Sequence, residues 1–91
     1  MQEQAPMHEQ EVGVITHFWS RIGVAGVKLE EPLKVGDHIH VQGHSDDFEQ
    51  DVESIEIEHA KVAHADPGSE IGIRVKEPVH EHDRIFKTVA D

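Results

Sequence analysis

Histidines are the side chains of this sequence with the widest chemical range. His38 and His40 alternate along a predicted strand, so both leave the same face, and His80 and His82 repeat this spacing in a predicted loop. Neutral imidazole is a common ligand of zinc, copper and nickel. The two pairs therefore define one hypothesis, a metal-binding or metal-sensing protein.

Neither pair is a complete metal site. A catalytic zinc ion takes three protein ligands and a structural zinc ion takes four. His44 or Glu58 would have to join the first pair through the fold. The alternative is that the nine histidines are solvated surface residues, and we expect no resident metal or cofactor. In either case a reference pKa of about 6.5 places their change of charge in the mildly acid range.

The sequence predicts no enzyme. No Gly-x-Ser-x-Gly motif surrounds a serine, and the absence of cysteine removes thiol nucleophiles. The phosphate-binding motif Gly-x-x-x-x-Gly-Lys-Ser/Thr is also absent, so GTP hydrolysis is not expected. Acidic pairs such as Glu56 and Glu58 are typical of solvated faces, because acidic residues are abundant here.

Two surfaces are candidates for binding a partner protein. Trp19 is the only tryptophan and shares the outward face of the first predicted strand with His17, next to Arg21 in the following turn. Tryptophan and arginine are enriched where partners dock. The alternative for Trp19 is a plug over one end of the fold. The acidic pair Glu56 and Glu58 offers a second surface, suited to a basic partner.

Composition describes a single globular domain. The chain has 91 residues, of which 36% are apolar and 30% charged, and 19 acidic against 8 basic residues give a net charge of −11. This charge disfavours nucleic acid, and direct RNA or ribosome binding remains an alternative. We expect neither a membrane-spanning segment nor a signal peptide, and the lack of cysteine favours a cytoplasmic location.

Apolar residues alternate with polar ones from Glu11 onward, which is typical of strands with one buried face. Residues 1–10 are predicted to form a flexible acidic tail and residues 11–91 a single β domain without helices. The predicted strands lie at about 11–18, 22–29, 38–42, 48–58, 71–76 and 84–90. Six short strands joined by turns favour a small closed antiparallel Greek-key barrel.

The alternation also predicts which side chains point inward. In the first strand Val12, Val14, Thr16 and Phe18 share the inward parity. In the second strand the inward parity changes, and Gly26 is predicted to be the bulge that allows the change. A second bulge is predicted near residues 53–54.

Several short segments occur in the order known from one family. They are Val12-Gly13-Val14, Gly23-Val24-Ala25-Gly26-Val27, Leu33-Lys34-Val35-Gly36-Asp37, Pro67-Gly68, Ile71-Gly72-Ile73 and Ile85-Phe86-Lys87. This order resembles the second, β-barrel domain of elongation factor Tu and other translational GTPases, and small stand-alone elongation factor-like proteins. It is also similar to the barrel at the carboxyl end of a collagenase-like peptidase family associated with RNA modification.

The resemblance implies a barrel of the reductase, isomerase and elongation factor type. It also implies a non-enzymatic binding module that docks onto a protein of the translation, RNA-modification or peptidase-family machinery, without membrane or nucleotide. The GTPase domain of translation factors has no counterpart in this sequence, and fold alone carries function only by analogy.

Overall fold

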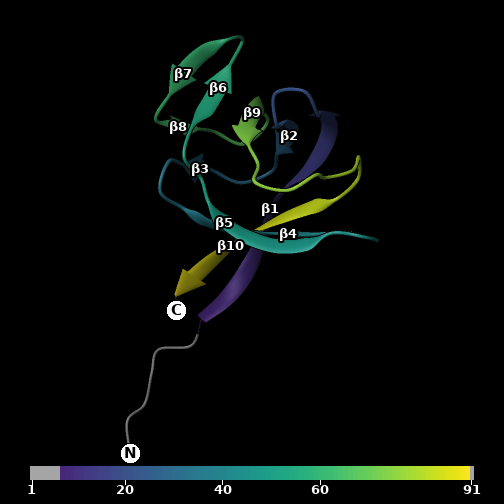
Figure 1. Cartoon of the computed structure of the whole chain (residues 1–91). Helices are drawn as coiled ribbons and strands as arrows, with labels where there is room; N and C mark the ends of the chain where they lie inside the picture. The colour runs from purple at the N-terminus through teal and green to yellow at the C-terminus, as the bar shows by residue number, and fades with distance from the viewer. Residues whose placement is uncertain (1–6, 91) are drawn as a thin grey trace, which may run out of the picture.

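The computed structural model describes residues 7–90, and the sequence alternation appears there as ten strands and no helix. Figure 1 shows the strands, with the long β1 running through the molecule. The strands are β1 (Met7–Trp19), β2 (Val24–Leu29), β3 (Leu33–Lys34), β4 (His38–Gln42), β5 (Asp47–Asp51), β6 (Ile55–Ile57), β7 (Ala60–Val62), β8 (His64–Ala65), β9 (Glu70–Arg74) and β10 (Arg84–Ala90).

All strand pairs are antiparallel. Eight strands form one sheet in the order β5-β4-β10-β1-β2-β9-β6-β7, and β3 pairs with β8 in a small second sheet. β1 is central because it pairs with β10 along its first half and with β2 along its second half. Within residues 7–90 no helix is long and apolar enough to cross a membrane.

The core forms where the inward faces of these strands meet. Its largest fully buried side chains are valines and isoleucines, together with Leu29 and Leu33. Valine and isoleucine are β-branched, and such side chains pack well on the pleated surface of a sheet. They are Val12, Ile15, Val27, Leu29, Leu33, Ile39, Val41, Val52, Ile55, Ile73 and Ile85. Every buried side-chain nitrogen or oxygen of the described residues has a hydrogen-bond partner.

The inward parity predicted for β1 is correct at Val12 and wrong at Thr16, which is exposed. Opposite β2 the register shifts between Ile15 and His17, so Thr16 is the extra residue of a bulge. The bulge turns Ile15 into the core. Gly26 itself lies in an unbroken register with β9, so the bulge predicted in the second strand belongs to the first strand instead.

The tail boundary was also placed too late. Residues 7–10 pair with β10, through His8 with Val89 and Gln10 with Lys87, so they belong to β1. This part of β1 could not be recognised from the sequence, because residues 7–10 do not alternate between apolar and polar side chains. Residues 1–6 lie outside the described part of the chain.

The structure has ten strands instead of six because one predicted strand divides and three short strands, β3, β7 and β8, form in segments that were predicted as turns or loops. Residues 48–58 separate into β5, at one edge of the sheet, and β6, beside β9. Between them Val52 is buried, and its backbone N–H donates to the carbonyl of Asp37 at 2.8 Å. The predicted all-β antiparallel class is therefore confirmed. The predicted closed barrel is not seen as a continuous ring of paired strands within residues 7–90, because β5 and β7 are the two edges of the large sheet.

The structure contains an internal repeat that the sequence analysis missed. Residues 26–39 and 72–85 share the pattern Gly, aliphatic, basic, aliphatic, any residue, Glu-Pro, aliphatic, three residues, Asp, any residue, Ile. Gly26 and Gly72, which are equivalent positions of the two repeats, pair directly with each other in the antiparallel β2–β9 ladder. His40 of β4 pairs with Phe86, the equivalent position of β10.

The turn of each repeat is held by the backbone of one residue from outside the repeat, Ile15 for one turn and Val52 for the other. Ile15 N–H donates to the carbonyl of Asp83, and the carbonyl of Ile15 accepts from His82 N–H, both at 2.8 Å. Val52 makes the same two bonds, at 2.8 Å each, with Asp37 and Gly36. The two turns, residues 33–37 and residues 79–83, are therefore held in equivalent ways.

Candidate functional site

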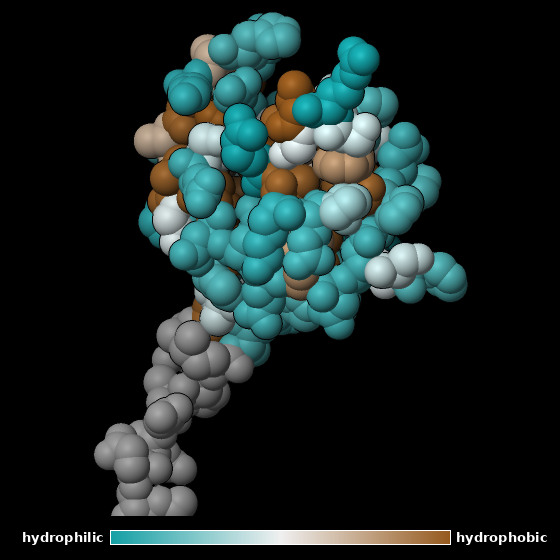
Figure 2. Space-filling view, in the orientation of Figure 1, coloured by the Kyte–Doolittle hydropathy of each residue, from teal (hydrophilic) through white to brown (hydrophobic). Residues whose placement is uncertain are grey.

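A groove crosses the outer face of β1, β2, β9 and β6. Its volume is about 590 Å³. Gly26 and Gly72 pair side by side beneath it and contribute no side chains, so the sheet is bare at this point. Figure 2 shows hydrophobic residues gathered in the upper part of the molecule, where Figure 1 places β2, β6 and β9. The lower part, around β4 and β5, is covered by hydrophilic side chains.

Trp19 forms one wall of this groove. Its indole lies over Gly26, where an added Cβ would approach the ring to 3.2 Å. The imidazole of His17 packs against the indole with ring centroids 4.4 Å apart. Trp19 is nevertheless 47% exposed, and its neighbour Ile22 is 58% exposed. Trp19 is therefore a partly open surface aromatic and not the plug that was its alternative.

The other wall carries charge. Glu56 projects from β6, and Glu58 follows in the turn to β7 with φ of 50°, next to His59 with φ of 69°. Ile57 pairs with Ala60, so these two residues form a two-residue hairpin turn with positive φ at both positions. Asn and Gly ordinarily occupy such turns, because side chains are strained there.

The groove unites three of the five predicted partner-binding residues. Trp19, Glu56 and Glu58 all line it, although the sequence analysis placed them on two separate surfaces. His17 supports Trp19 from the side. Arg21 is exposed in the turn after β1 and does not line the groove.

Three lining features went unnoticed in the sequence. Ile22 was counted as a strand residue, yet it stands in the turn and is exposed. Arg74 of β9 reaches across and donates to the carbonyl of Ile22 at 3.3 Å. The signal available was the pair of glycines in matching motifs, Gly26 in Ala-Gly-Val and Gly72 in Ile-Gly-Ile, because glycine in a strand often marks a close approach.

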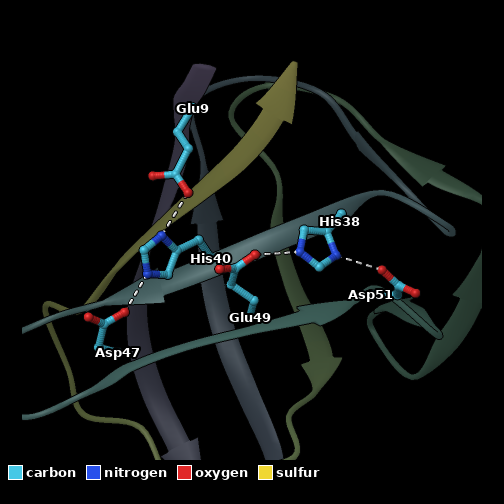
Figure 3. Close-up of polar contacts among 6 residues, drawn as sticks. All are labelled: Glu9, His38, His40, Asp47, Glu49 and Asp51. Carbon is cyan, nitrogen blue, oxygen red and sulfur yellow. Dashed lines mark hydrogen bonds and ion pairs between the residues drawn. The ribbon is translucent and has the colours of Figure 1, made fainter. Parts of the chain in front are cut away.

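The predicted histidine pair on β4 lies on a different face, shown in Figure 3. His38 Nδ1 is 2.8 Å from a carboxylate oxygen of Asp51, and its Nε2 is 2.7 Å from Glu49. Carboxylates accept hydrogen bonds, so both ring nitrogens must donate. The hydrogen bonds to Asp51 and Glu49 raise the pKa of His38.

His40 is held in the same manner and is more buried. Its Nε2 is 2.5 Å from Asp47, and its Nδ1 is 2.7 Å from Glu9 of β1. The hydrogen bond to Asp47 raises the pKa of His40, burial opposes this change, and Glu9 adds to it. Both β4 histidines are therefore set up as imidazolium ions between two carboxylates, with no lone pair free for a metal ion.

His80 joins two aspartates at the far end of this face. Its Nδ1 is 2.7 Å from Asp46. This hydrogen bond raises the pKa of His80. The Asp46 carboxylate also hydrogen-bonds to Asp83, which lowers the pKa of Asp46, while burial and the Asp46 carboxylate raise the pKa of Asp83.

The metal hypothesis gains no better support from these positions. Within the described residues one group of possible ligand atoms gathers within 4.8 Å, that of Asp46, His80 and Asp83. His82, predicted as the partner of His80, is not part of it. The predicted third ligands, His44 and Glu58, belong to no such group either. What the sequence analysis missed was the row of carboxylates that surrounds the histidines, because the pairing depends on strand register.

The sequence and the fold were compared with those of known proteins. No family model matches the chain. An uncharacterized protease of Methanocaldococcus jannaschii is 32% identical over 77 residues, which cover 84% of this chain and 19% of the protease. The chain therefore spans about a fifth of the length of that relative.

Two solved structures have the same fold. One is the C-terminal domain of a putative U32 peptidase from Geobacillus thermoleovorans, with a TM-score of 0.79 and 23% identity, covering 84% of this chain and 89% of that chain. The other is its selenomethionine variant, with a TM-score of 0.80 and 22% identity, covering 84% and 96%. At these identities the likeness shows the fold alone.

These comparisons correct the resemblance inferred from the sequence. They point to the C-terminal domain of U32 peptidases and not to an elongation factor domain, so the assignment to translation factors was wrong. A translation-factor binding module is accordingly not supported. The Val-Gly, Pro-Gly and Gly-Asp segments that suggested it are turn and strand signals, which unrelated barrels share. Peptidase-family machinery is the part of the partner prediction that the comparisons fit.

Proposed function

We propose that this chain is a non-catalytic accessory domain that works beside the catalytic module of a U32-type peptidase. One observation carries the proposal: the chain aligns over 84% of its own length with only 19% of a protease. The structural match to a peptidase's C-terminal domain agrees with it. In this proposal the accessory domain contacts the catalytic module or its substrate through its outer surface.

The side-chain chemistry supports a role without catalysis. His38, His40 and His80 hydrogen-bond to carboxylates. A serine nucleophile needs a histidine base within hydrogen-bond reach, and no serine of the described residues makes such a bond. The absence of cysteine favours a reducing compartment, and we place the activity in the cytoplasm.

We also propose that the sheet curls into a barrel, as the sequence pattern predicted. The amide of Gln50, on edge strand β5, donates to the carbonyl of Arg74 at 2.8 Å and accepts from the N–H of Lys76 at 2.9 Å. A side-chain amide with this pair of bonds imitates a strand partner. Gln50 thereby joins an edge of the sheet to the end of β9.

Domain replacement tests the accessory function. In the Methanocaldococcus protease, the 77-residue matching segment is removed, and this chain is grafted in its place. We expect the truncated protease to lose solubility or peptidase activity, and the graft to restore at least half of what the native segment provides. Failure of the graft, while re-insertion of the native segment succeeds, would contradict the proposal.

A further inference from the structure

Two sets of acidic residues, one on the histidine face and one at the groove, differ in their partners. On the histidine face each carboxylate of one group hydrogen-bonds to a histidine: these are Glu9, Asp46, Asp47, Glu49 and Asp51. At the groove, the side-chain carboxylates of Glu56, Glu58 and Glu70 have neither a hydrogen bond nor an ion pair with any residue of the described part. Negative charge is thus neutralised internally on one face and left open on the other.

Neighbouring cations form no ion pair with the three groove carboxylates within residues 7–90. Lys61 and Lys28 stand opposite Glu56 and Glu70 in the strand ladders, yet neither forms an ion pair with them within residues 7–90. Arg74 is turned to the carbonyl of Ile22 instead. Three open carboxylates around one depression attract a positively charged group of a partner.

The wall opposite the carboxylates is apolar. Trp19, Ile22 and Val24 line it, and Trp19 and Ile22 are about half exposed, at 47% and 58%. Large exposed apolar side chains beside a charged rim are typical of protein docking sites. The face of an indole also attracts cations.

Backbone strain adds an independent sign of function at the same place. Glu58 and His59 both have positive φ, at 50° and 69°. Such strain costs stability and is found mostly where it positions functional side chains. In this turn it holds the Glu58 carboxylate at the rim of the groove.

We propose that this groove binds an extended basic segment of a partner protein, in which lysine or arginine alternates with apolar residues. The basic side chains face Glu56, Glu58 and Glu70, and an apolar side chain packs on Trp19 and Ile22. Any protein with such a segment could be the partner, so binding at the groove can be tested separately from the role beside a peptidase module.

The single tryptophan makes the test direct. Because Trp19 is the only tryptophan and no tyrosine is present, intrinsic fluorescence of the full chain reports on the groove. The probe is a synthetic peptide of alternating Lys and Leu, with blocked ends. At about 0.15 M salt, which screens long-range attraction, we expect saturable binding with a shift of the Trp19 emission. A peptide with Glu in place of Lys should not bind.

Matched variants separate docking in the groove from attraction to the net charge. Glu56→Gln with Glu58→Gln should weaken binding of the Lys-Leu peptide about tenfold. Glu30→Gln with Glu77→Gln removes the same charge from exposed positions outside the groove and should change the affinity less than about twofold. Equal weakening by both double variants, or no saturable shift of the Trp19 emission, would overturn the proposal.

Trp19→Ala, measured by calorimetry because the fluorophore is lost, should weaken binding at least as much as the acidic double variant. Trp19→Phe keeps an aromatic wall and should retain most of the affinity. Unchanged binding in Trp19→Ala would place the peptide elsewhere and contradict the proposal.

Discussion

The turns that end in Asp37 and Asp83 follow the same path but face different neighbours. In each, the aspartate accepts a hydrogen bond at 3.0 Å from the N–H three residues earlier, in Lys34 and His80, and returns one at 3.1 Å to the same residue's carbonyl. Each turn also contains one residue with positive φ, Gly36 at 98° and His82 at 78°. The local sequence therefore builds the same turn twice.

Their electrostatics are opposite. Burial alone would raise the pKa of Asp37, but the ammonium of Lys34 at 2.7 Å and the charge of Lys87 lower it. For Asp83, burial and the neighbouring Asp46 carboxylate raise the pKa. Two copies of the same turn therefore shift the pKa of their aspartate in opposite directions, because the rest of the fold brings lysines near Asp37 and a carboxylate near Asp83.

The largest expected effect concerns the space above Asp83. An added Cβ at Gly43 would overlap the Asp83 carboxylate. We therefore expect Gly43→Ala to lower the free energy of unfolding by about 2 kcal/mol, as overpacking does, measured by urea denaturation. His44→Ala, an exposed position in the same hairpin, is the control. A loss no larger than that of the control would mean that Asp83 does not occupy this space.

The opposite electrostatics can be tested with one substitution in each turn. Asp37→Asn removes a carboxylate held by two lysines and should lower the free energy of unfolding at pH 7 by about 1 kcal/mol. Asp83→Asn removes one of two adjacent carboxylates and keeps the turn, so stability at pH 7 should stay the same or rise. Equal losses in both variants would contradict the comparison.

The same pair predicts the sign of the acid response. The contribution of Asp37, whose pKa is lowered by folding, is present above the ordinary value of 3.8 and is lost as the pH falls through the lowered value. Asp83, whose pKa is raised, contributes fully below 3.8 and its contribution is lost as the pH rises through the raised value. Denaturation curves of the two Asn variants between acid and neutral pH should deviate from wild type in opposite directions.

Exchange of the left-handed residues sharpens the comparison further. His82 has a side chain at positive φ, whereas Gly36 has none. We expect His82→Gly to raise stability by about 1 kcal/mol and Gly36→His to lower it by about 1 kcal/mol. Thermal unfolding measures both. Matching signs would show that the two turns are not equivalent.

The smallest expected effect belongs to the histidine face. The carboxylates around His38 and His40 raise both pKa values, so their contribution is complete below 6.5 and is lost as the pH rises through the raised values. Because the four carboxylates around these histidines are exposed to solvent, which screens the interaction, each histidine should contribute only about 0.5 kcal/mol. Wild type should lose stability from pH 6.5 upward, and His38→Gln with His40→Gln should flatten this decline. An equally steep decline in the double variant would assign it to other groups.

Much of the fold could be predicted from alternation and turn chemistry. The β4–β5 hairpin and the turn at Pro67-Gly68 follow directly from local sequence, because polar alternation and Gly with positive φ have few other uses. Parity beyond Ile15 could not be predicted, since a bulge at Thr16 depends on how β1 meets β2. The candidate groove is formed by four strands, β1, β2, β6 and β9, from separate parts of the chain, so the sequence analysis assigned its residues to two unrelated surfaces.

By itself the sequence determined an all-β antiparallel domain with a strongly acidic surface, because side-chain alternation and composition are local properties. Only the tertiary structure decided which acids are neutralised and which are open. Strand register sets Asp51 beside His38, and places Glu56 at the groove that is floored by Gly72. Charge interactions fall off steeply with distance and solvent exposure, so identical carboxylates acquire different roles from their neighbours in space.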